Sequence, residues 1–360
     1  AVWSMVARGA RLVEYWHWHS LHYGAETYWG GILGHSLEPG RIYDELSSVG
    51  NELKGAADVV GQLSTHSDVG VLVSAESRWA MEFMAPLSAP GSGWFGDKQS
   101  YDRILAAFYR GLVDAGLAAD IVAPQQLPDA DEMVRRWPVL VVPGLYIAAD
   151  VLLARLRAYV EAGGHLVLTP RTGYADEDAV ARYVVMPGVL RDVVGASYLH
   201  FTNLRSAVPI AIADSAELSG AGTGWADELI PDSATVLARY QHPHLREFAA
   251  VTTNPFGKGR ATYVGTVPDR ALSASLAKWL AAVSLDEDPW RSARPASVTC
   301  TSSTTPAGQV VRFVHNWGWE QAAFVLPTAV RDVLSRAELD AGDRLALGSW
   351  DVRVLLEEPA

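Results

Sequence analysis

The sequence is poor in cysteine, in basic residues and in long apolar runs. Its single cysteine, Cys300, cannot form an internal disulfide, and no paired-cysteine zinc spacing is present, which favours a cytoplasmic protein. Lysine and arginine number 29 against 41 aspartates and glutamates, so neither nucleic acid nor an anionic membrane is an expected partner. No apolar run reaches the ~18 residues that a membrane-spanning helix needs, so no such helix is expected.

The chain is long enough for more than one domain. With 360 residues, 49% of them hydrophobic, the sequence predicts two or three domains that each have a core. It begins Ala-Val-Trp-Ser-Met, without an initiating methionine and without the basic segment of a signal peptide. We therefore expect the chain to be the C-terminal part of a longer protein.

The most informative segment is residues 15–31, YWHWHSLHYGAETYWGG. Residues 11–19 predict a strand, because they are rich in β-branched and aromatic side chains, and Gly24 predicts the loop that follows. A polar and aromatic cluster at the carboxyl end of a strand is where α/β barrels place their chemistry. The cluster surrounds one carboxylate, Glu26, and consists of Trp16, Trp18 and Trp29 with His17, His19 and His22.

Three interpretations of this cluster compete. Sugar binding is one, because pyranose C–H faces stack on indole rings while imidazoles and carboxylates bond the hydroxyls. A metal site is another, because strand alternation would place His17 and His19 on one side, with His22 close by. The third is ordinary packing in a barrel interior. We favour sugar binding, because a core rarely needs three imidazoles and short His-x-His spacings often arise by chance.

The same residues resemble a known family. Residues 15–20 (YWHWHS), 24–31 (GAETYWGG) and 35–41 are similar to the last barrel strand and following loop of the family 42 glycoside hydrolases, the β-galactosidases. The resemblance continues through residues 74–80 (SAESRWA) and 142–146 (VPGLY) to the C-terminal tail. It implies retaining hydrolysis of terminal non-reducing β-D-galactose residues, and we expect no cofactor.

The resemblance also implies roles for individual residues. Glu26 matches the family carboxylate that hydrogen-bonds galactose hydroxyls. Trp29 stands where some members carry a sugar-binding histidine, so stacking is expected there in place of a polar contact. The catalytic nucleophile and acid/base of the family follow the fourth and seventh barrel strands, so we expect no catalytic residue in this chain. The other expected galactose contacts are Trp16, His17, Trp18 and His19.

Hydrophobic patterning predicts three domains. Residues 1–66 are expected to be the last strand and closing helix of a TIM barrel, with the helix over 41–63. Residues 67–287 predict an α/β domain with an open parallel sheet and helices on both faces, and residues 288–360 predict a small antiparallel β domain. The predicted elements of the middle domain are strands 68–74, 119–122, 138–143, 165–169 and 258–264, and helices 101–115, 150–161 and 269–283.

The middle domain is similar to the glutamine-amidotransferase-like (flavodoxin-like) trimerisation domain of family 42 enzymes. A working amidotransferase needs a nucleophilic cysteine on a sharp strand-to-helix turn. Here the turn after residues 165–169 carries Arg171, and the only cysteine lies outside the domain. We therefore expect a homotrimer and no amidotransferase chemistry. The apolar segment 79–94 is expected to be buried against the barrel or a neighbouring subunit.

Three tryptophans of the C-terminal domain, Trp317, Trp319 and Trp350, have two interpretations. They form either a stacking platform for a carbohydrate or part of a core or interface. Their placement on strand patterns favours packing.

The favoured interpretation of the whole chain is part of a retaining β-galactosidase that binds a galactoside or galacto-oligosaccharide. A non-catalytic assembly or carbohydrate-binding module is one alternative. A metal-dependent enzyme that uses His17, His19 and His22 is the other.

Overall fold

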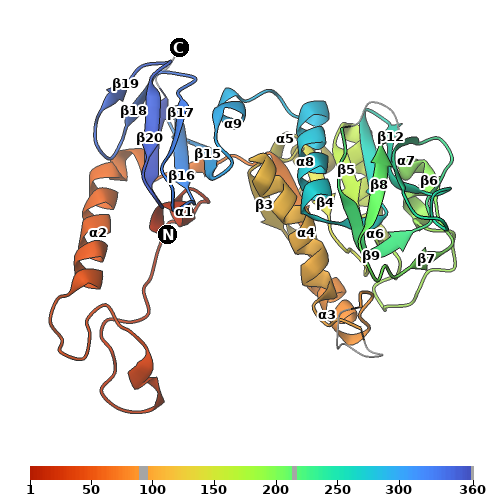
Figure 1. The fold of residues 1–360 in the computed structure, drawn as a ribbon, viewed down its shortest axis with the longest axis horizontal. Coiled ribbons are helices and arrows are strands. Elements are labelled where there is room, and N and C mark those ends of the chain that lie inside the picture. Colours follow the sequence, from red (N-terminus) through yellow and green to blue (C-terminus); the bar gives the residue numbers. More distant parts are fainter. Residues whose placement is uncertain (89–95, 213–216, 358–360) are drawn as a thin grey trace. The chain divides into compact units, whose positions relative to one another are not determined.

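The chain divides into two compact units (Figure 1). The computed structural model describes residues 1–88, 96–212 and 217–357. We call Ser67–Glu287 the α/β unit, and we call Ala1–His66 together with Asp288–Ala360 the terminal unit, because both ends of the chain form it. Among the described residues, no helix is both long enough and apolar enough to cross a membrane.

One 11-stranded mixed sheet forms the centre of the α/β unit. Five neighbouring strands run parallel in the order β13-β5-β4-β2-β3. All five were predicted from short apolar runs, and they are confirmed within a few residues at each end. Their bounds are β2 Val69–Leu72, β3 Ala119–Val122, β4 Val139–Val142, β5 His165–Leu168 and β13 Gly259–Val264.

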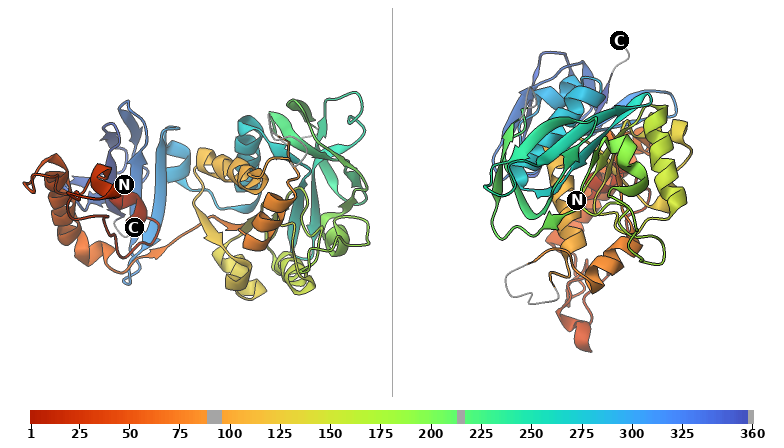
Figure 2. Two further views of the ribbon diagram at one scale, coloured as in Figure 1. Left: turned by 90° about the horizontal axis from the view of Figure 1, so that it is seen from below. Right: turned by 90° about the vertical axis from the view of Figure 1, so that its right-hand side faces the viewer.

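Helices cover both faces of this sheet (Figure 2). Val139 and Val141 of β4 contribute to one core, and Leu140 and Val142 contribute to the other, because successive side chains of a strand point to opposite faces. Burial on both faces explains why β2 and β4 are apolar throughout. The first core includes residues of α3 (Ala75–Phe83), α4 (Ser100–Ala115) and α8 (Arg270–Ser284), and the second includes residues of α5 (Ala130–Arg136), α6 (Asp150–Ala162) and α7 (Arg191–Val194).

Helices α4 and α8 pack at close range through a glycine. A Cβ added at Gly111 would lie 2.1 Å from Ser273 Oγ and 2.4 Å from the Ser273 carbonyl oxygen. The Ser273 hydroxyl donates to the Ala107 carbonyl oxygen at 2.5 Å. Only glycine at position 111 allows this contact between the two helices.

The other half of the sheet is antiparallel, which the sequence analysis did not predict. These strands continue the sheet from β13 in the order β12-β11-β8-β9-β14. They are harder to recognise because β9 contains two glycines and β12 ends in Asn-Pro-Phe. Their bounds are β8 Val208–Ile212, β9 Ala221–Asp227, β11 Thr235–Tyr240, β12 Ala249–Phe256 and β14 Thr266–Pro268, with β7 Phe201–Thr202 paired to β9 and a separate pair of β6 Ala196–Ser197 with β10 Ile230–Pro231.

The terminal unit contains a six-stranded antiparallel sheet in the order β1-β15-β16-β21-β18-β19. The predicted antiparallel β fold of the C-terminal segment is confirmed. Strand β1 comes from the N-terminal segment and pairs with β15. The bounds are β1 Ser64–Thr65, β15 Val298–Thr304, β16 Val310–Asn316, β18 Val330–Asp332, β19 Glu338–Leu339 and β21 Val352–Glu357, with a second sheet of β17 Ala322–Val325 and β20 Arg344–Leu347.

Each face of the six-stranded sheet has its own core. On one face, Trp290 of α9 (Pro289–Ala293) packs with Phe324 and Leu355. On the other face, helices α1 (Val2–Val6) and α2 (Arg41–Val60) contribute Trp3 and Ala56 to a core with Phe313 and Val354. We call this second cluster the helix-sheet core. Because of it, the predicted barrel segment and the predicted C-terminal domain form one compact unit.

The predicted strand at residues 11–19 is wrong. Apart from a single bridge between His19 and Leu33, these residues form no β-structure, and the segment from Ala10 to Gly40 contains only a short 3₁₀ helix, Ala25–Tyr28. A strand is stable only when a neighbour satisfies its backbone groups, and this segment pairs only with residues 31–33. Aromatic and β-branched composition favours a strand, but it does not provide the neighbouring strand with which to pair.

A carboxylate is buried in the antiparallel half of the α/β unit. Asp227, at the end of β9, accepts a hydrogen bond from Trp225 Nε1 at 2.8 Å and another from the Tyr263 hydroxyl at 2.9 Å. Burial is the dominant effect on this group and raises the pKa of Asp227 to about 7. The folded protein therefore holds a proton here that the unfolded chain, with an ordinary aspartate, has lost above pH ~4.

We expect Asp227→Asn to change how the stability of the α/β unit depends on pH. Because the folded-state pKa is raised, stability is lost as pH rises from ~4 to ~7, and an asparagine does not ionise. At pH 8 the variant should be more stable than the parent by about 1–3 kcal/mol, and near pH 4 the two should agree. Urea unfolding at a series of pH values measures the difference.

The parent must be measured beside the variant, because His165 makes stability depend on pH in the opposite direction. Burial and the nearby Arg260 lower its pKa to about 3, so both proteins lose stability as pH falls below ~6. A difference between variant and parent that did not change between pH 4 and pH 8 would contradict a buried, protonated Asp227.

Candidate functional site

The aromatic segment forms a loop that is closed at its base, which we call the aromatic loop (residues 17–33). The Ile32 and Leu33 amides donate to the carbonyl oxygens of His17 and Trp18, each at 2.9 Å, and the Ser20 amide donates to the Leu33 carbonyl oxygen at 2.9 Å. These hydrogen bonds hold the two ends of the loop together, so the backbone between them carries the tip from a fixed base.

A glycine makes this closure possible. A Cβ added at Gly31 would lie 2.3 Å from the His19 carbonyl carbon and 2.5 Å from the Ser20 nitrogen, and both are backbone atoms that cannot rotate away. The Gly31 amide donates to Ser20 Oγ at 2.9 Å, and that serine is itself buried. This hydrogen bond joins the two sides of the loop base.

Glu26 and Trp29 lie at the tip of the loop. The 3₁₀ helix Ala25–Tyr28 carries Glu26, and Trp29 follows directly as its C-cap, with the Trp29 amide donating to the Glu26 carbonyl oxygen at 3.1 Å. Trp29 has extended backbone angles, so the chain leaves the helical turn at this residue. Both side chains are exposed, Trp29 by 62%. The two predicted residues thus belong to one short turn, and their role in binding stays a prediction.

The other predicted contacts are near the loop base, but they do not share one face. The Trp16 ring is 80% exposed and stacks on the His17 ring with centroids 5.6 Å apart. The Trp18 ring instead meets Tyr43 of α2 edge to face at 6.4 Å. These indoles are not core residues of the terminal unit, and packing in a complete barrel interior stays an alternative.

The histidines are held by backbone carbonyl groups. His22 Nε2 donates to the His35 carbonyl oxygen at 2.7 Å, and His35 Nε2 donates to the Leu21 carbonyl oxygen at 3.0 Å, which fixes both tautomers because a carbonyl can only accept. His19 Nδ1 donates to the Ser20 carbonyl oxygen at 3.0 Å. His17 Nε2 is buried and has no hydrogen-bond partner among the residues that the structure describes.

The metal interpretation of these histidines is not supported. In the described part of the chain, no group of three or more histidine, cysteine, aspartate or glutamate side chains is placed to hold a metal ion. The prediction assumed a strand that would align His17 with His19. Without the strand, the His17 ring packs on Trp16, whereas the His19 ring lies 6.0 Å from that of His22.

The α/β unit has no thiol nucleophile at its strand-to-helix turns. After β5 the chain turns through Arg171, whose φ is 69°. The guanidinium carbon lies 4.0 Å from the centroid of the Tyr174 ring and 4.9 Å from that of Tyr146, so aromatic faces surround a permanent cation. Cys300 is on β15 of the terminal unit, and burial raises the pKa of its thiol to about 12. A protonated thiol is a poor nucleophile.

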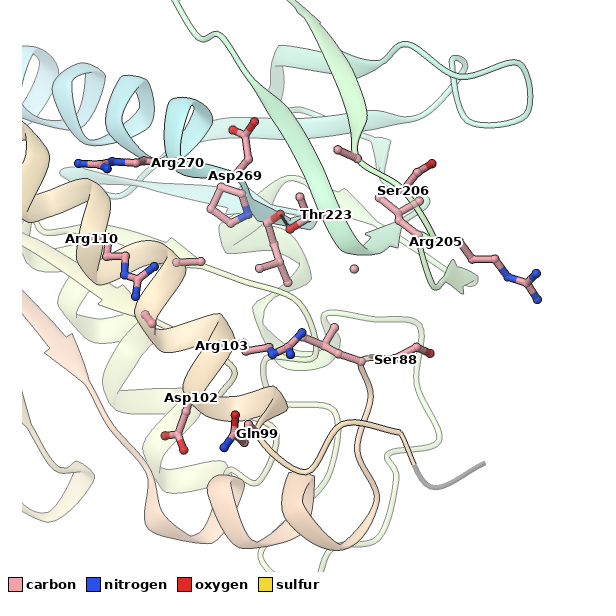
Figure 3. Close-up of a pocket in the computed structure, with 18 of the residues that line it drawn as sticks. Ser88, Gln99, Asp102, Arg103, Arg110, Arg205, Ser206, Thr223, Asp269 and Arg270 are labelled. Atoms are coloured by element: carbon pink, nitrogen blue, oxygen red, sulfur yellow. Dashed lines mark hydrogen bonds between the residues drawn. The ribbon is translucent and has the colours of Figure 1, made fainter. Parts of the chain in front are cut away.

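A pocket of about 770 Å³ opens beside α4 in the α/β unit, and the sequence analysis did not identify it (Figure 3). Arg103 and Arg110 reach it from α4, whereas Arg205 points away from the other labelled cations. Arg103 pairs with Asp97 at 2.6 Å, and Arg270 pairs with Asp114 at 2.8 Å. No histidine or cysteine is among the described residues that line it, so the pocket offers neither a thiol nor an imidazole for catalysis.

Comparison with known proteins identifies the family. The sequence profile of the β-galactosidase trimerisation domain of family 42 matches residues 67–285, which is more than half of the chain, and the β-galactosidase profile of the same family matches residues 1–56. The chain belongs to the family 42 β-galactosidases. The α/β unit is thus a trimerisation domain, and the predicted family and fold class are confirmed.

Individual relatives agree with this assignment. The β-galactosidase BgaB of Geobacillus sp. strain Y412MC61 is 31% identical over 272 residues, covering 74% of this chain and 38% of BgaB. BgaA of Clostridium cellulovorans is 29% identical over 262 residues, covering 73% and 37%. The chain therefore spans less than two fifths of the length of these curated relatives.

Solved structures share the fold over nearly the whole chain. The β-galactosidase from Rahnella sp. R3 is 25% identical with a TM-score of 0.84, covering 98% of this chain and 50% of that one. Gan42B, a β-galactosidase from G. stearothermophilus, is 23% identical with a TM-score of 0.85, covering 99% and 49%. At the latter identity the likeness concerns the fold alone.

We expect Gly31→Ala to open the aromatic loop, because the added methyl group would overlap the backbone of His19 and Ser20. The loop should become at least about tenfold more sensitive to proteolysis, since local opening exposes cleavage sites. Limited digestion followed by mass spectrometry of the fragments measures this. Gly30→Ala is the matched control, because a Cβ there meets nothing within 4 Å. Equal cleavage of the two variants would show that the loop base is not held at Gly31.

Proposed function

We propose that this chain supplies galactose-binding residues to a retaining β-galactosidase that hydrolyses terminal non-reducing β-D-galactose residues. The observation that carries the proposal is the tip of the aromatic loop, where one short turn carries an exposed carboxylate, Glu26, and an exposed indole, Trp29. The family match over residues 1–56 includes this loop. The nucleophile and the acid/base would be supplied by a part of the barrel that this chain does not contain.

The loop chemistry suits a galactose unit. A carboxylate accepts charge-assisted hydrogen bonds from two neighbouring hydroxyls, and an indole face stacks on the apolar side of the pyranose ring. His17 adds a buried ring nitrogen that no described side chain or backbone group engages. Trp16, Trp18 and His19 would line the base of the pocket, and Trp29 provides stacking where a histidine would provide a hydrogen bond.

The exposed aromatic area argues that another surface covers the loop. Trp16, Tyr23 and Tyr28 are exposed by 80%, 80% and 95%. Several large aromatic side chains exposed on one short segment are typical of a surface that binds a ligand or a partner. The missing barrel wall, with its two carboxyl groups about 5 to 5.5 Å apart, fits this requirement for a retaining enzyme.

A chimeric enzyme tests the role of Glu26. The chain would replace the matching C-terminal segment of Geobacillus BgaB, and hydrolysis of nitrophenyl β-galactoside would be followed. We expect Glu26→Gln to lower kcat/KM by about 10- to 100-fold, because it removes a charged acceptor of substrate hydroxyls. Glu14→Gln is the matched control, since Glu14 is also exposed but lies outside the loop.

The 360-residue chain alone tests whether the catalytic carboxylates lie outside it. It should release no nitrophenol above the buffer rate while remaining folded by circular dichroism. Release that Glu26→Gln abolishes without loss of binding would make Glu26 a catalytic carboxylate and would overturn the proposal. If the chimera is active and indifferent to Glu26→Gln, the chain is instead an assembly or carbohydrate-binding module.

We also propose that the chain forms a homotrimer through its α/β unit. The match to a trimerisation domain supports this, and α3 exposes two large aromatic side chains. Trp79 and Phe83 lie one turn apart on the same side of α3, exposed by 66% and 83%, and Met84 follows. These residues belong to the segment 79–94 that was predicted to be buried by a neighbour, of which 89–94 lie outside the described residues.

Sedimentation velocity tests the trimer. The parent chain should sediment as three copies, and Phe83→Glu should shift it toward the monomer, because a charge would be buried without a partner in the interface. Tyr183→Glu is the control, since that tyrosine is 98% exposed on another part of the same unit. Dissociation by Tyr183→Glu and not by Phe83→Glu would place the interface elsewhere, and a monomeric parent would contradict the proposed trimer.

A further inference from the structure

Three tryptophans meet on the surface of the terminal unit, far along the chain from the aromatic loop. The ring centroids of Trp317 and Trp350 are 6.1 Å apart with an interplanar angle of 90°, and those of Trp319 and Trp350 are 5.6 Å apart with an angle of 72°. Trp319 is 79% exposed and Trp350 is 53% exposed. These rings are therefore not core residues of this unit, whereas their expected role in an interface stays a prediction. We call the group the indole platform.

A buried asparagine holds the two turns that carry the platform. Asn316 Nδ2 donates to the carbonyl oxygens of Glu320 and Gly348, at 2.8 Å and 2.7 Å. Asn316 Oδ1 accepts from the Gly318 amide at 3.0 Å. One side chain that is almost fully buried thus links the turn of Trp317 and Trp319 to the turn of Trp350. The spacing of the indoles is set before any ligand arrives.

The backbone at Trp350 is strained. Its φ is 53°, a left-handed conformation that bulky residues rarely adopt and that costs about 1–3 kcal/mol. The Trp350 amide donates to the Gly318 carbonyl oxygen at 3.1 Å, and Asp351 Oδ2 accepts from the Gly348 amide at 3.1 Å. These bonds keep a large aromatic side chain pointing outward in a conformation that a glycine or an asparagine would adopt more readily.

The platform is backed by a neutral, rigid support. The His315 ring stacks on one face of Trp317 with centroids 5.2 Å apart and planes within 12°. Burial and the positive charge of Arg8 lower the pKa of His315 to about 4, so this ring is neutral near pH 7. Trp317 Nε1 donates to Thr299 Oγ1 at 2.8 Å, which fixes the ring further. Trp317 is therefore immobile, and Trp319 and Trp350 provide the accessible faces.

Fixed indoles that meet edge to face suit one class of ligand. An edge-to-face contact covers one face of only one of the two rings, whereas stacking covers a face of each. Pyranose rings bind such faces through their C–H sides, and little reorganisation is needed when the aromatic rings are already held in place. Glu320 directly follows Trp319 and is exposed, so its carboxylate can accept hydrogen bonds from hydroxyl groups.

We propose that the indole platform is a second carbohydrate-binding site, separate in sequence from the aromatic loop, and that it binds pyranose units of a galactose-containing oligosaccharide or polysaccharide. The choice of galactose rests on the proposed function. The inference that a pyranose ring stacks on the platform is independent of that function. The platform would hold longer chains to the protein while their terminal residues are hydrolysed elsewhere.

Affinity electrophoresis of the folded 360-residue chain tests this site directly. Soluble β-1,4-linked galactan in the gel should retard the parent chain. Trp319→Ala should weaken the retardation about tenfold in apparent Kd, and Trp319→Phe should recover part of it, because a smaller aromatic face remains. Trp319 is mostly exposed, so its replacement leaves the core intact. Tyr183→Ala is the matched control, an exposed aromatic residue of the α/β unit.

The outcomes separate this inference from the proposed function. Retardation that depends on Trp319 and persists in Glu26→Gln supports the platform, even if the chimeric enzyme shows no role for Glu26. Retardation that is lost in Glu26→Gln and retained in Trp319→Ala assigns binding to the aromatic loop and overturns the inference. Absence of retardation of the parent overturns it as well. So does a change of oligomeric state in Trp319→Ala without a change in retardation, because the platform would then be a protein contact.

Discussion

The helix-sheet core is the constraint on which the site depends. Trp3 and Ala56, from the two helices that flank the aromatic loop, pack against Phe313 and Val354 from the last part of the chain. Trp3 Nε1 also donates to Glu52 Oε2 at 2.9 Å, which ties α1 to α2. The loop between these helices buries few side chains of its own, so its ends are positioned by a core that needs both ends of the sequence. Folding of the C-terminal strands is therefore a precondition for a formed loop base.

The α/β unit has the fold of a glutamine amidotransferase, but it contains no cysteine that could act as the nucleophile. The turn after β5 has a backbone that could present a nucleophile, yet it carries Arg171, which is always protonated and which aromatic rings surround. Two of the arginines that line the charged pocket beside α4, Arg103 and Arg270, are paired with carboxylates. The unit also exposes two aromatic side chains of α3, Trp79 and Phe83, and its sequence matches a trimerisation domain.

The two exposed aromatic groups of the terminal unit differ in how they are held. At the base of the aromatic loop, Trp18 and the preceding Trp16 contact different partners, and the base itself is closed by backbone hydrogen bonds. In the indole platform, the rings contact each other and stand on turns that one buried asparagine connects. In the proposed enzyme the first arrangement would need a facing wall to form a pocket, whereas the second exposes Trp319 and Trp350 as it stands.

Sequence alone determined the family, the five parallel strands and the antiparallel nature of the C-terminal segment. These features follow from local patterns, because a strand buried on both faces must be apolar throughout, as in Val139–Val142. Tertiary structure alone decided that residues 11–19 form no strand, that the sheet continues through β12 to β14, and that the chain ends share a core. Each of these depends on which distant backbone is available for pairing or packing. A residue's own propensity does not contain that information, so Gly31 and Asn316 show their roles only when the segments they join are in contact.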